Sequence, residues 1–363
     1  MKLSYFTMPL HPPGRDWRET LDEDRAAVLL ADRLGYHEAF VGEHVTDRAE
    51  TVTSCLMFLA SLAYETGAIR LGSGTVNLPN SHPAAVAAQV AMLDHMLAGR
   101  FVFGISPGGL RSDAEVFGNL DRDRRAMFDE AIEQVLAIWS GEPPYELDGE
   151  FWTVSTRRTL DLAIGQGAIL GPYQRPHPPI MVACMSPFSD SVANAAQRGW
   201  SIVSANFLQP VWVKSHRDKL AEGWADGGHT PNPADWRVAR SIFVADDAHT
   251  ARTYAMEPDG AYGNYYRSLM HKLIGNGRPD LFKTRRDMAD AEVTHDFVMR
   301  SLVIHGTPAQ VAEQIVALRE TVGEFGTLVY AGHDWVDGAL ARRSMELMAT
   351  EVMPAVNRAL GEA

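Results

Sequence analysis

Residues 69–105 read IRLGSGTVNLPNSHPAAVAAQVAMLDHMLAGRFVFGI, a strand, a helix and a second strand in succession. The run 69–76 has the length and composition of a β-strand. In the stretch 83–98, the apolar residues at positions 86, 90, 93 and 97 fall on one face of a helix. The run 101–105 is again apolar and short. This order is the repeating unit of a parallel sheet covered by helices.

The same alternation continues along the whole chain. We count eight strand-like runs, each followed by a segment of helical period. They are residues 3–8, 38–42, 69–76, 101–105, 180–183, 202–205, 238–245 and 328–331. Such repeats form either a doubly wound sheet or a closed barrel, and eight of them without a break in composition favour closure. The predicted fold class is α/β, a (β/α)8 TIM barrel in which residues 1–363 form a single domain.

Three stretches exceed what a barrel needs. They are about 141–178, which is rich in Gly and Pro, then 256–294, and a last helix over 344–360. We interpret them as insertions or lids, not as separate domains.

Composition and charge exclude several classes of protein. Of the 363 residues, 46% are hydrophobic and 22% are charged, which is ordinary for a protein with a large buried core. The formal net charge of −13 disfavours binding to nucleic acid. The two cysteines are too few for a disulfide framework. Because we find neither a leader pattern nor about 18 consecutive apolar residues, we expect a cytoplasmic protein that does not contact membranes.

In barrels of this kind the functional groups lie where the strands end, so the candidate residues can be named from the sequence. They are Met8 and His11, Glu43 and His44, Asn77, residues 106–113, residues 184–186, Asn206 and residues 332–334.

Residues 104–108 match the G-x-S-x-G pattern of a hydrolase nucleophile, with Ser106 as the nucleophile. In such an elbow, the residue after the serine donates its backbone N–H to the oxyanion. Here that residue is Pro107, which has no N–H. We therefore predict that these glycines, among them Gly108, instead let the backbone approach a flat or anionic ligand.

A metal-dependent hydrolase is a second alternative, since His44, His82, His333 and Asp334 are residue types that bind divalent cations. The spacing disfavours it, because no H-x-H or H-x-x-H stands at a strand end. His82 is more simply explained as the entrance to a helix that begins at Pro83. We predict no metal.

Several polar residues keep two interpretations. His44 is either an acid–base group or a histidine hydrogen-bonded to Glu43 or Asp47. Asp113 either takes part in the site or caps the turn towards residue 115. Ser186 and Ser189 flank the start of a helix, as an ordinary cap or as an anion site. The alternating charges of residues 121–125 are predicted to form a solvated first turn of a helix.

Several segments resemble the bacterial luciferase-like flavin-dependent oxidoreductases, in particular the branch that includes limonene and diketocamphane monooxygenases. Residues 43–44, 78–83, 93–101 and 116–118 are similar to luciferase α-subunit segments, in the same order. Residues 306–308, 325–328, 332–335 and 351–354 are similar to the monooxygenase branch. The resemblance spans almost the whole chain.

This resemblance implies a two-component monooxygenase. Such an enzyme takes reduced FMN (FMNH2) from a separate NAD(P)H:flavin reductase and activates O2 as a flavin C4a-(hydro)peroxide. It also implies a homodimer. His44 matches the family's active-site histidine, Asp113 matches an acidic residue that influences the flavin, and Ser106 faces the reactive edge of the ring. Near residues 74–76, the family carries a non-prolyl cis peptide bond.

The resemblance also implies a cofactor-binding set at the strand ends. We predict that this set is Met8, Thr75, Asn77, Ser106, Gly108, Arg111, Met185, Ser186 and Ser189. Luciferase uses an arginine in the loop after the fourth strand to contact the phosphate, and Pro107 stands there in this chain. The phosphate is held either by Arg111 or by the backbone N–H groups of Met185 and Ser186 with the Ser189 hydroxyl.

The substrate predicted by this resemblance is a small apolar or polycyclic organic molecule. Hydroxylation, epoxidation and Baeyer–Villiger insertion stay open. Two alternatives also stay open: an oxidoreductase that uses the deazaflavin F420, and a non-catalytic flavin-binding protein.

Overall fold

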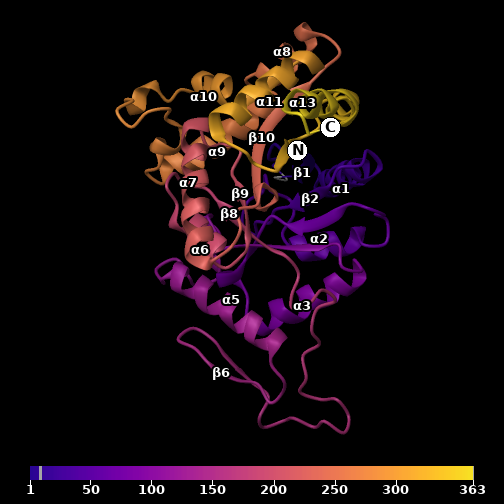
Figure 1. Cartoon of the computed structure of the whole chain (residues 1–363), viewed down its shortest axis with the longest axis vertical. Coiled ribbons are helices and arrows are strands. Elements are labelled where there is room, and N and C mark those ends of the chain that lie inside the picture. The colour runs from indigo at the N-terminus through magenta and orange to yellow at the C-terminus, as the bar shows by residue number, and fades with distance from the viewer. Residues whose placement is uncertain (8–9, 363) are drawn as a thin grey trace.

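The structure is a computed structural model that describes residues 1–7 and 10–362. Eight parallel strands form a closed barrel, so the predicted fold class is confirmed (Figure 1). The ring closes because β10 pairs with β12 on one side and with β9 on the other. In order around the ring, the strands are β1 (Lys2–Thr7), β2 (Glu38–Val41), β3 (Arg70–Ser73), β5 (Phe101–Ser106), β8 (Ile180–Cys184), β9 (Ser201–Ser204), β10 (Trp236–Val244) and β12 (Thr327–Gly332).

Two short strands extend the barrel at its carboxyl edge. The predicted strand 69–76 is divided in two, because pairing stops after Ser73 and resumes in β4 (Val76–Asn77), which pairs with β5. The peptide bond between Gly74 and Thr75 is cis, as the resemblance implies. The second addition, β11 (Val303–Gly306), pairs with the end of β10 and lies outside the predicted strands.

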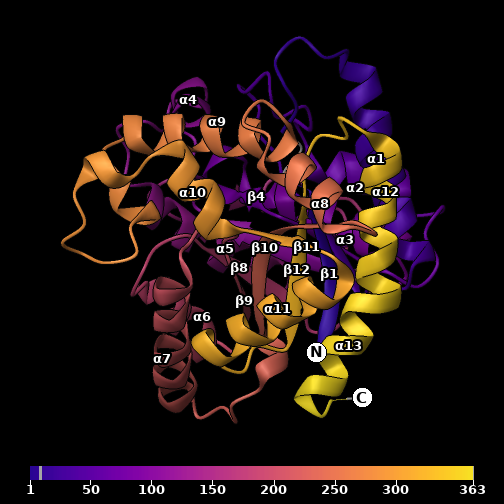
Figure 2. The ribbon, with the colours of Figure 1, turned by 90° about the horizontal axis from the view of Figure 1, so that it is seen from above.

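Helices cover the outside of the barrel (Figure 2). Helix α3 (Pro83–Met96) shows why the helical spacing of apolar residues predicted a helix here. Its predicted face of Val86, Val90 and Leu93 is buried, and so is Leu97 at its end. Burying each such side chain contributes about 1.5–3 kcal/mol. The other helices around the barrel are α1 (Trp17–Arg33), α2 (Cys55–Leu62), α4 (Arg111–Val116), α5 (Arg124–Ser140), α6 (Asp190–Gln197), α7 (Pro210–Gly227), α8 (Ala248–Met256), α10 (His295–Leu302) and α11 (Pro308–Val322).

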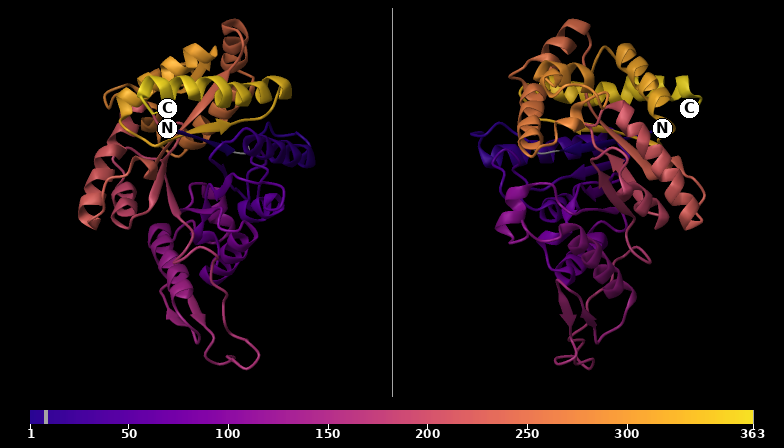
Figure 3. Two further views of the ribbon diagram at one scale, coloured as in Figure 1. Left: turned by 45° about the vertical axis from the view of Figure 1, so that its right-hand side comes forward. Right: turned by 90° about the vertical axis from the view of Figure 1, so that its left-hand side faces the viewer.

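The segment 141–178 forms an arm that projects away from α3 and α5 (Figures 1 and 3). It contains an antiparallel hairpin of β6 (Glu146–Asp148) and β7 (Thr153–Ser155). Its return to the barrel is fixed at Gln174, whose backbone N–H and side-chain amide both donate to the buried carboxylate of Asp94.

The segment 256–294 contributes α9 (Ala261–Gly275) and two short 3-10 turns, Pro279–Phe282 and Asp290–Glu292. The C-terminal helix is longer than predicted. It begins as α12 (Gly338–Leu347), because Asp337 accepts from two backbone N–H groups there, and continues through a π turn into α13 (Met353–Leu360). The two ends of the chain lie close together (Figure 2), and the amino group of Met1 donates to Asn357 (3.0 Å).

A buried ion pair holds the amino end of the barrel together, opposite the carboxyl ends of the strands. The Glu38 carboxylate accepts two hydrogen bonds of 2.7 Å from the Arg237 guanidinium, and Arg70 adds a third at 3.3 Å. Glu38 is fully buried. Among the described residues, no helix has both the length and the apolar character that crossing a membrane demands.

Candidate active site at the mouth of the barrel

A cavity of about 190 Å³ lies at the carboxyl ends of the strands. We call it the mouth cavity. Its walls are mostly apolar, with a few polar groups among them. Its lining includes Phe6, Phe40, Glu43, His44, Glu50, Thr75, Asn77, Ser106, Leu110, Met181, Met185, Asn206, Tyr265, Leu269 and Lys272. An apolar cleft with few convergent polar groups is typical of a site for a small organic ligand.

Three buried polar side chains form a chain of hydrogen bonds in one wall of the mouth cavity. The Thr75 hydroxyl donates to Ser106 Oγ (2.7 Å), and the Ser106 hydroxyl donates to Asn77 Oδ1 (2.8 Å). The pairing of β4 with β5 places Asn77 opposite Ser106. The Ser106 proton is therefore engaged with an amide oxygen and not with a base, which agrees with the rejection of a serine hydrolase.

Gly108 turns the chain back towards this wall. Its φ of +78° is in the left-handed region that glycine adopts readily. Its backbone N–H donates to Ser106 Oγ (3.1 Å).

His44 and Asp113 meet across the mouth of the barrel. His44 Nδ1 lies 2.8 Å from Asp113 Oδ2. The other carboxylate oxygen, Oδ1, accepts from the backbone N–H groups of Val45 and Thr46 and from the Thr46 hydroxyl (2.6 Å). Asp113 therefore fixes both the imidazole ring and the loop that carries it.

The partners of His44 differ from Glu43 and Asp47, the two residues that the sequence suggests as its hydrogen-bond partners. The structure shows Asp113 at Nδ1 and Glu50 Oε2 at 3.3 Å from Nε2. The Glu43 carboxylate instead accepts from the backbone N–H of Cys55 (2.9 Å).

The charges around His44 shift its proton affinity. Burial alone would lower the pKa of His44, but the nearby Glu50 and Asp113 carboxylates outweigh it and raise the pKa above its usual value. Burial would raise the pKa of Asp113, but hydrogen bonds from His44 and Thr46 lower it instead. A histidine whose proton affinity is tuned beside an apolar cavity is suited to acid–base chemistry at neutral pH.

A second hollow of about 680 Å³ lies between helices α5 and α6, next to the end of β8. We call it the α5–α6 groove. It is lined by Pro107, Arg125, Met185, Ser186, Ser189, Ser191 and Asn194, among others. Ser189 stands at the N-cap position of α6, but in the described chain its hydroxyl caps none of the helix N–H groups. Arg125 reaches across from α5 and donates to Ser191 Oγ (2.7 Å).

The structure brings most of the predicted residues into two places. His44, Thr75, Asn77 and Ser106 line the mouth cavity, Ser186 and Ser189 line the groove, and Met185 lines both. Asp113 supports His44 from α4, and Gly108 supports Ser106. Arg111 is exposed at the start of α4 and is not among the residues that line either hollow. Met8 lies outside the described residues.

Three charged residues near these hollows were not predicted. Arg125 belongs to the run 121–125 that was interpreted as a solvated turn, and its alternating signs gave no cue to the groove. Glu50 and Lys272 lie away from the strand ends, in the loop after β2 and in α9, so their place in the mouth cavity depends on tertiary packing.

Comparisons with known proteins agree with this geometry. Residues 1–324 match the model of a family described as luciferase-like monooxygenase. A 4-hydroxyprotoasukamycin monooxygenase of Streptomyces nodosus subsp. asukaensis is 30% identical over 98% of this chain and 92% of its own length. The chain belongs to the luciferase-like monooxygenase family. The resemblance seen in the sequence is thus confirmed, and the chain is an enzyme, a monooxygenase.

Other relatives of this luciferase-like monooxygenase point to the same branch. Limonene 1,2-monooxygenase of Rhodococcus erythropolis is 32% identical over 98% of this chain and 87% of its own length. Among solved structures, the oxygenating constituent of 3,6-diketocamphane monooxygenase of Pseudomonas putida, in complex with FMN, has a TM-score of 0.87. It is 27% identical, with 98% of each chain covered.

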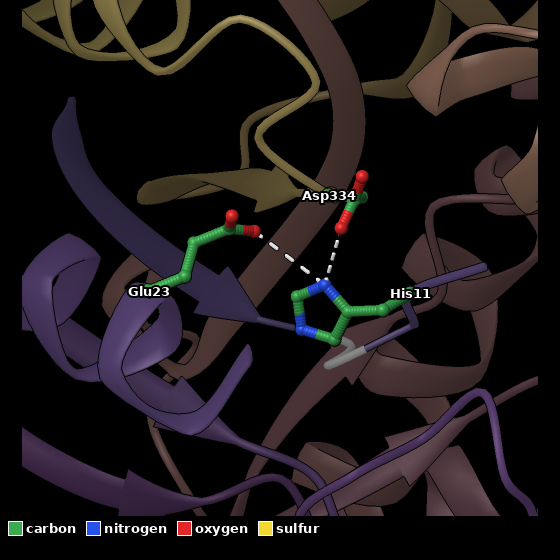
Figure 4. Close-up of side chains that lie close together, drawn as sticks. All are labelled: His11, Glu23 and Asp334. Atoms are coloured by element: carbon green, nitrogen blue, oxygen red, sulfur yellow. Dashed lines mark hydrogen bonds and ion pairs between the residues drawn. The ribbon is translucent and has the colours of Figure 1, made fainter. Parts of the chain in front are cut away.

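Beside the mouth of this luciferase-like monooxygenase, the described residues include one group with metal-ligand geometry: His11, Glu23 and Asp334. Figure 4 shows both carboxylates directed at one nitrogen of His11. Arg15 already pairs with Glu23 (3.1 Å) and with Asp334, and Asp24 lies 3.1 Å from the other ring nitrogen. His11 and Arg15 therefore partner all three carboxylates, and the group is explained as an internal ion-pair network.

This network predicts a pH dependence of stability. Burial would lower the pKa of His11, but its hydrogen bonds to Asp24 and Asp334 raise it from 6.5 to about 9. A histidine whose pKa is higher in the folded than in the unfolded protein stabilises the fold fully at pH values below the unfolded-state pKa. This stabilisation is lost as pH rises through the folded-state pKa. We expect the free energy of unfolding to fall between pH 6.5 and about 9. Urea denaturation at several pH values measures this fall, and it should be smaller in His11→Gln. An equal fall in both proteins would contradict the role of His11.

Proposed function

We propose that this enzyme is the FMNH2-dependent oxygenase component of a two-component system. It receives FMNH2 from a separate NAD(P)H:flavin reductase and uses O2 to oxygenate a small apolar or polycyclic substrate. The observation that carries the proposal is that the mouth cavity and the α5–α6 groove adjoin, because Ala183 and Met185 line both. A ligand with a flat apolar head and an anionic tail suits this pair of hollows.

The residues present fit FMN. The apolar lining from Phe6, Phe40 and Met181 suits a flat ring system, and the polar wall around Ser106 offers hydrogen bonds to its edge. Ser186 and Ser189 stand at the amino end of α6, where backbone N–H groups and the helix dipole favour an anion. Arg125 adds a positive charge on the other side of the groove, where it also pairs with Asp129 (3.1 Å).

The residues around the mouth cavity then have distinct roles. Reduced FMN supplies the activation of O2 when it is bound. His44 gives or takes a proton at Nε2, Asp113 orients it through Nδ1, and the apolar walls exclude water. The polar wall is formed by the hydrogen bonds that connect Thr75, Asn77, Ser106 and Gly108.

The relatives support the substrate class. Two are named for limonene and for diketocamphane, which are small alicyclic molecules, and a trigonelline monooxygenase of Acinetobacter baylyi, 27% identical, is named as an oxygenase component. Epoxidation, hydroxylation and Baeyer–Villiger insertion are all compatible with this site.

Binding under anaerobic conditions tests the proposal against its alternatives. The chain is titrated with FMNH2 and, separately, with reduced F420, and air is then admitted with a cyclic terpene alkene or a bicyclic ketone present. Selective binding of FMNH2 followed by oxygenated product supports the proposal. Selective binding of reduced F420 with hydride transfer and no use of O2 would favour the F420-dependent alternative, which a 24% identical relative named as a putative F420-dependent oxidoreductase keeps open. Binding of FMN without any turnover would favour a non-catalytic flavin-binding protein.

The phosphate assignment gives a separate prediction. Replacing Arg125 with Gln should weaken binding of FMN about tenfold, because a charge-assisted hydrogen bond is lost, and should leave riboflavin binding unchanged. Isothermal titration with both ligands measures the difference. Arg111→Gln is the matched control, with no change expected. Loss of FMN affinity in the Arg111 variant alone would move the phosphate to α4.

We also propose a homodimer. Support comes from the arm 141–178, which stands away from the barrel and exposes Leu162, Ile164 and Leu170 to solvent (Figure 3). Apolar residues exposed together on a projecting segment are typical of a surface that a second copy covers. Light scattering on the purified chain tests the dimer, and a monomer at micromolar concentration would contradict it.

A further inference from the structure

Glu50 presents a buried carboxylate to His44 from the side that Asp113 does not reach. Its side chain is 4% exposed, and its Oε2 lies 3.3 Å from His44 Nε2. Among the described residues, this oxygen has no hydrogen-bond partner. A backbone bridge to Leu10 and a hydrogen bond from the Glu50 N–H to Asp47 O (3.2 Å) fix the loop that carries it. A buried carboxylate oxygen left without a donor, directed at a titratable ring, requires an explanation.

Lys272 meets the same carboxylate from α9. Its ammonium group contacts Glu50 Oε1 and Asp47 Oδ2, and its side chain is partly buried. Burial would lower the pKa of Lys272, but these two carboxylates raise it. One cation from the inserted segment is therefore shared between two carboxylates of the barrel loop.

The charges that face His44 come from four parts of the chain. They are Asp113 on α4, Glu50 and Asp47 on the loop after β2, Glu43 at the end of β2, and Lys272 on α9. Carboxylates lie at both ring nitrogens, so a ring that donates to Asp113 through Nδ1 would turn a bare lone pair towards Glu50 unless Nε2 is also protonated. The arrangement favours the doubly protonated ring, and Lys272 is the group that opposes it.

We propose that Glu50 is a positioning residue that holds a proton on Nε2 of His44, and that Lys272 weakens this hold. The position of α9, which carries Lys272, then sets how readily His44 gives its proton to a group bound in the mouth cavity. The use of that proton in turnover rests on the proposed function, whereas the charge arrangement does not.

The test titrates His44 in the protein without cofactor. Heteronuclear NMR of histidine-labelled protein gives the titration curve, and a His44→Gln spectrum identifies the signal. Glu50→Gln should lower the pKa of His44 by about one unit, a tenfold loss of proton affinity, because the neighbouring negative charge is removed. Lys272→Met should raise the pKa, by about half a unit or more, because Glu50 is no longer neutralised.

The opposite signs separate this proposal from a merely structural role. Loosening of the loop would move both variants in the same direction, towards the ordinary histidine value. Lys272→Arg should restore the wild-type curve. Glu65→Gln and Lys219→Met, which alter exposed ion pairs, are the matched controls and should leave His44 unchanged. If Glu50→Gln fails to fold, Lys272→Met still decides the matter.

Two results would overturn the proposal: an unchanged or raised pKa in Glu50→Gln, or an unchanged or lowered pKa in Lys272→Met. Turnover with FMNH2 provides a second readout, in which the alkaline limb of the pH profile should move to lower pH in Glu50→Gln and to higher pH in Lys272→Met. A chain that shows both NMR shifts but binds no FMNH2 would contradict the proposed function and not the charge arrangement.

Discussion

Replacing His44 with alanine is expected to lower substrate oxygenation by about a hundredfold, while the chain still binds FMNH2. General acid–base groups typically contribute 10²–10⁴-fold to a rate, and His44 is an imidazole that lines the mouth cavity beside the polar wall of Ser106. Without its proton transfer, the consumed O2 should leave as H2O2. Parallel measurement of O2 uptake, H2O2 and oxygenated product follows this uncoupling directly.

The control for this variant has to separate chemistry from folding. His44→Ala leaves Asp113 and Glu50 buried without their partner, so His44→Gln, which keeps a hydrogen-bonding side chain, is measured beside it. His82→Ala alters a histidine at the start of α3 that caps the helix and should not affect oxygenation. An unchanged product yield in a folded His44→Ala protein would remove His44 from the mechanism.

Replacing Glu38 with glutamine is expected to lower the free energy of unfolding by about 3–5 kcal/mol, because it leaves Arg237 as a buried charge without its partner. Burial would raise the pKa of Glu38, but its hydrogen bonds with Arg237 lower it instead. A carboxyl whose pKa is lower in the folded than in the unfolded protein stabilises the fold at pH values above the unfolded-state pKa. This stabilisation is lost as pH falls through the folded-state pKa. The difference between wild type and variant should therefore narrow in acid.

Urea denaturation at neutral and acidic pH measures both effects. Glu65→Gln is the matched control, because Glu65 pairs with Arg25 at the surface, where such pairs contribute about 0–1 kcal/mol. A loss of less than 1 kcal/mol in Glu38→Gln would show that the buried ion pair does not hold the amino end of the barrel together. Since Glu38 lies at the opposite end from His44, FMNH2 binding by the folded variant should be unchanged.

The barrel could be predicted from the sequence because local signals and tertiary packing agree there. In α3, the apolar positions 86, 90 and 93 repeat with helical period, and Pro83 begins the helix. The strand β11 was missed because residues 303–306 follow α10 without a turn residue between them. The hairpin of β6 and β7 was missed because its strands are three residues long and largely exposed, so they lack an alternating apolar pattern.

The candidate site could be predicted only where it is built from strand ends. His44 lies three residues after the end of β2, and Asn77 and Ser106 are the last residues of β4 and β5, so locating the strands was enough to find them. Arg125 and Lys272 come from helices outside that rule, and their positions depend on how α5 packs beside α6 and how α9 lies over the mouth. Long charged side chains carry no periodic signal that separates a solvated residue from one that turns inward.

A crystal structure of the chain soaked with FMN would show where the flavin binds. We expect the isoalloxazine ring in the mouth cavity, with its edge against Ser106 and His44 beside it, and the phosphate in the α5–α6 groove near Ser189 and Arg125. A mouth cavity that stays empty at saturating FMN, or a flavin bound elsewhere on the molecule, would contradict this expectation.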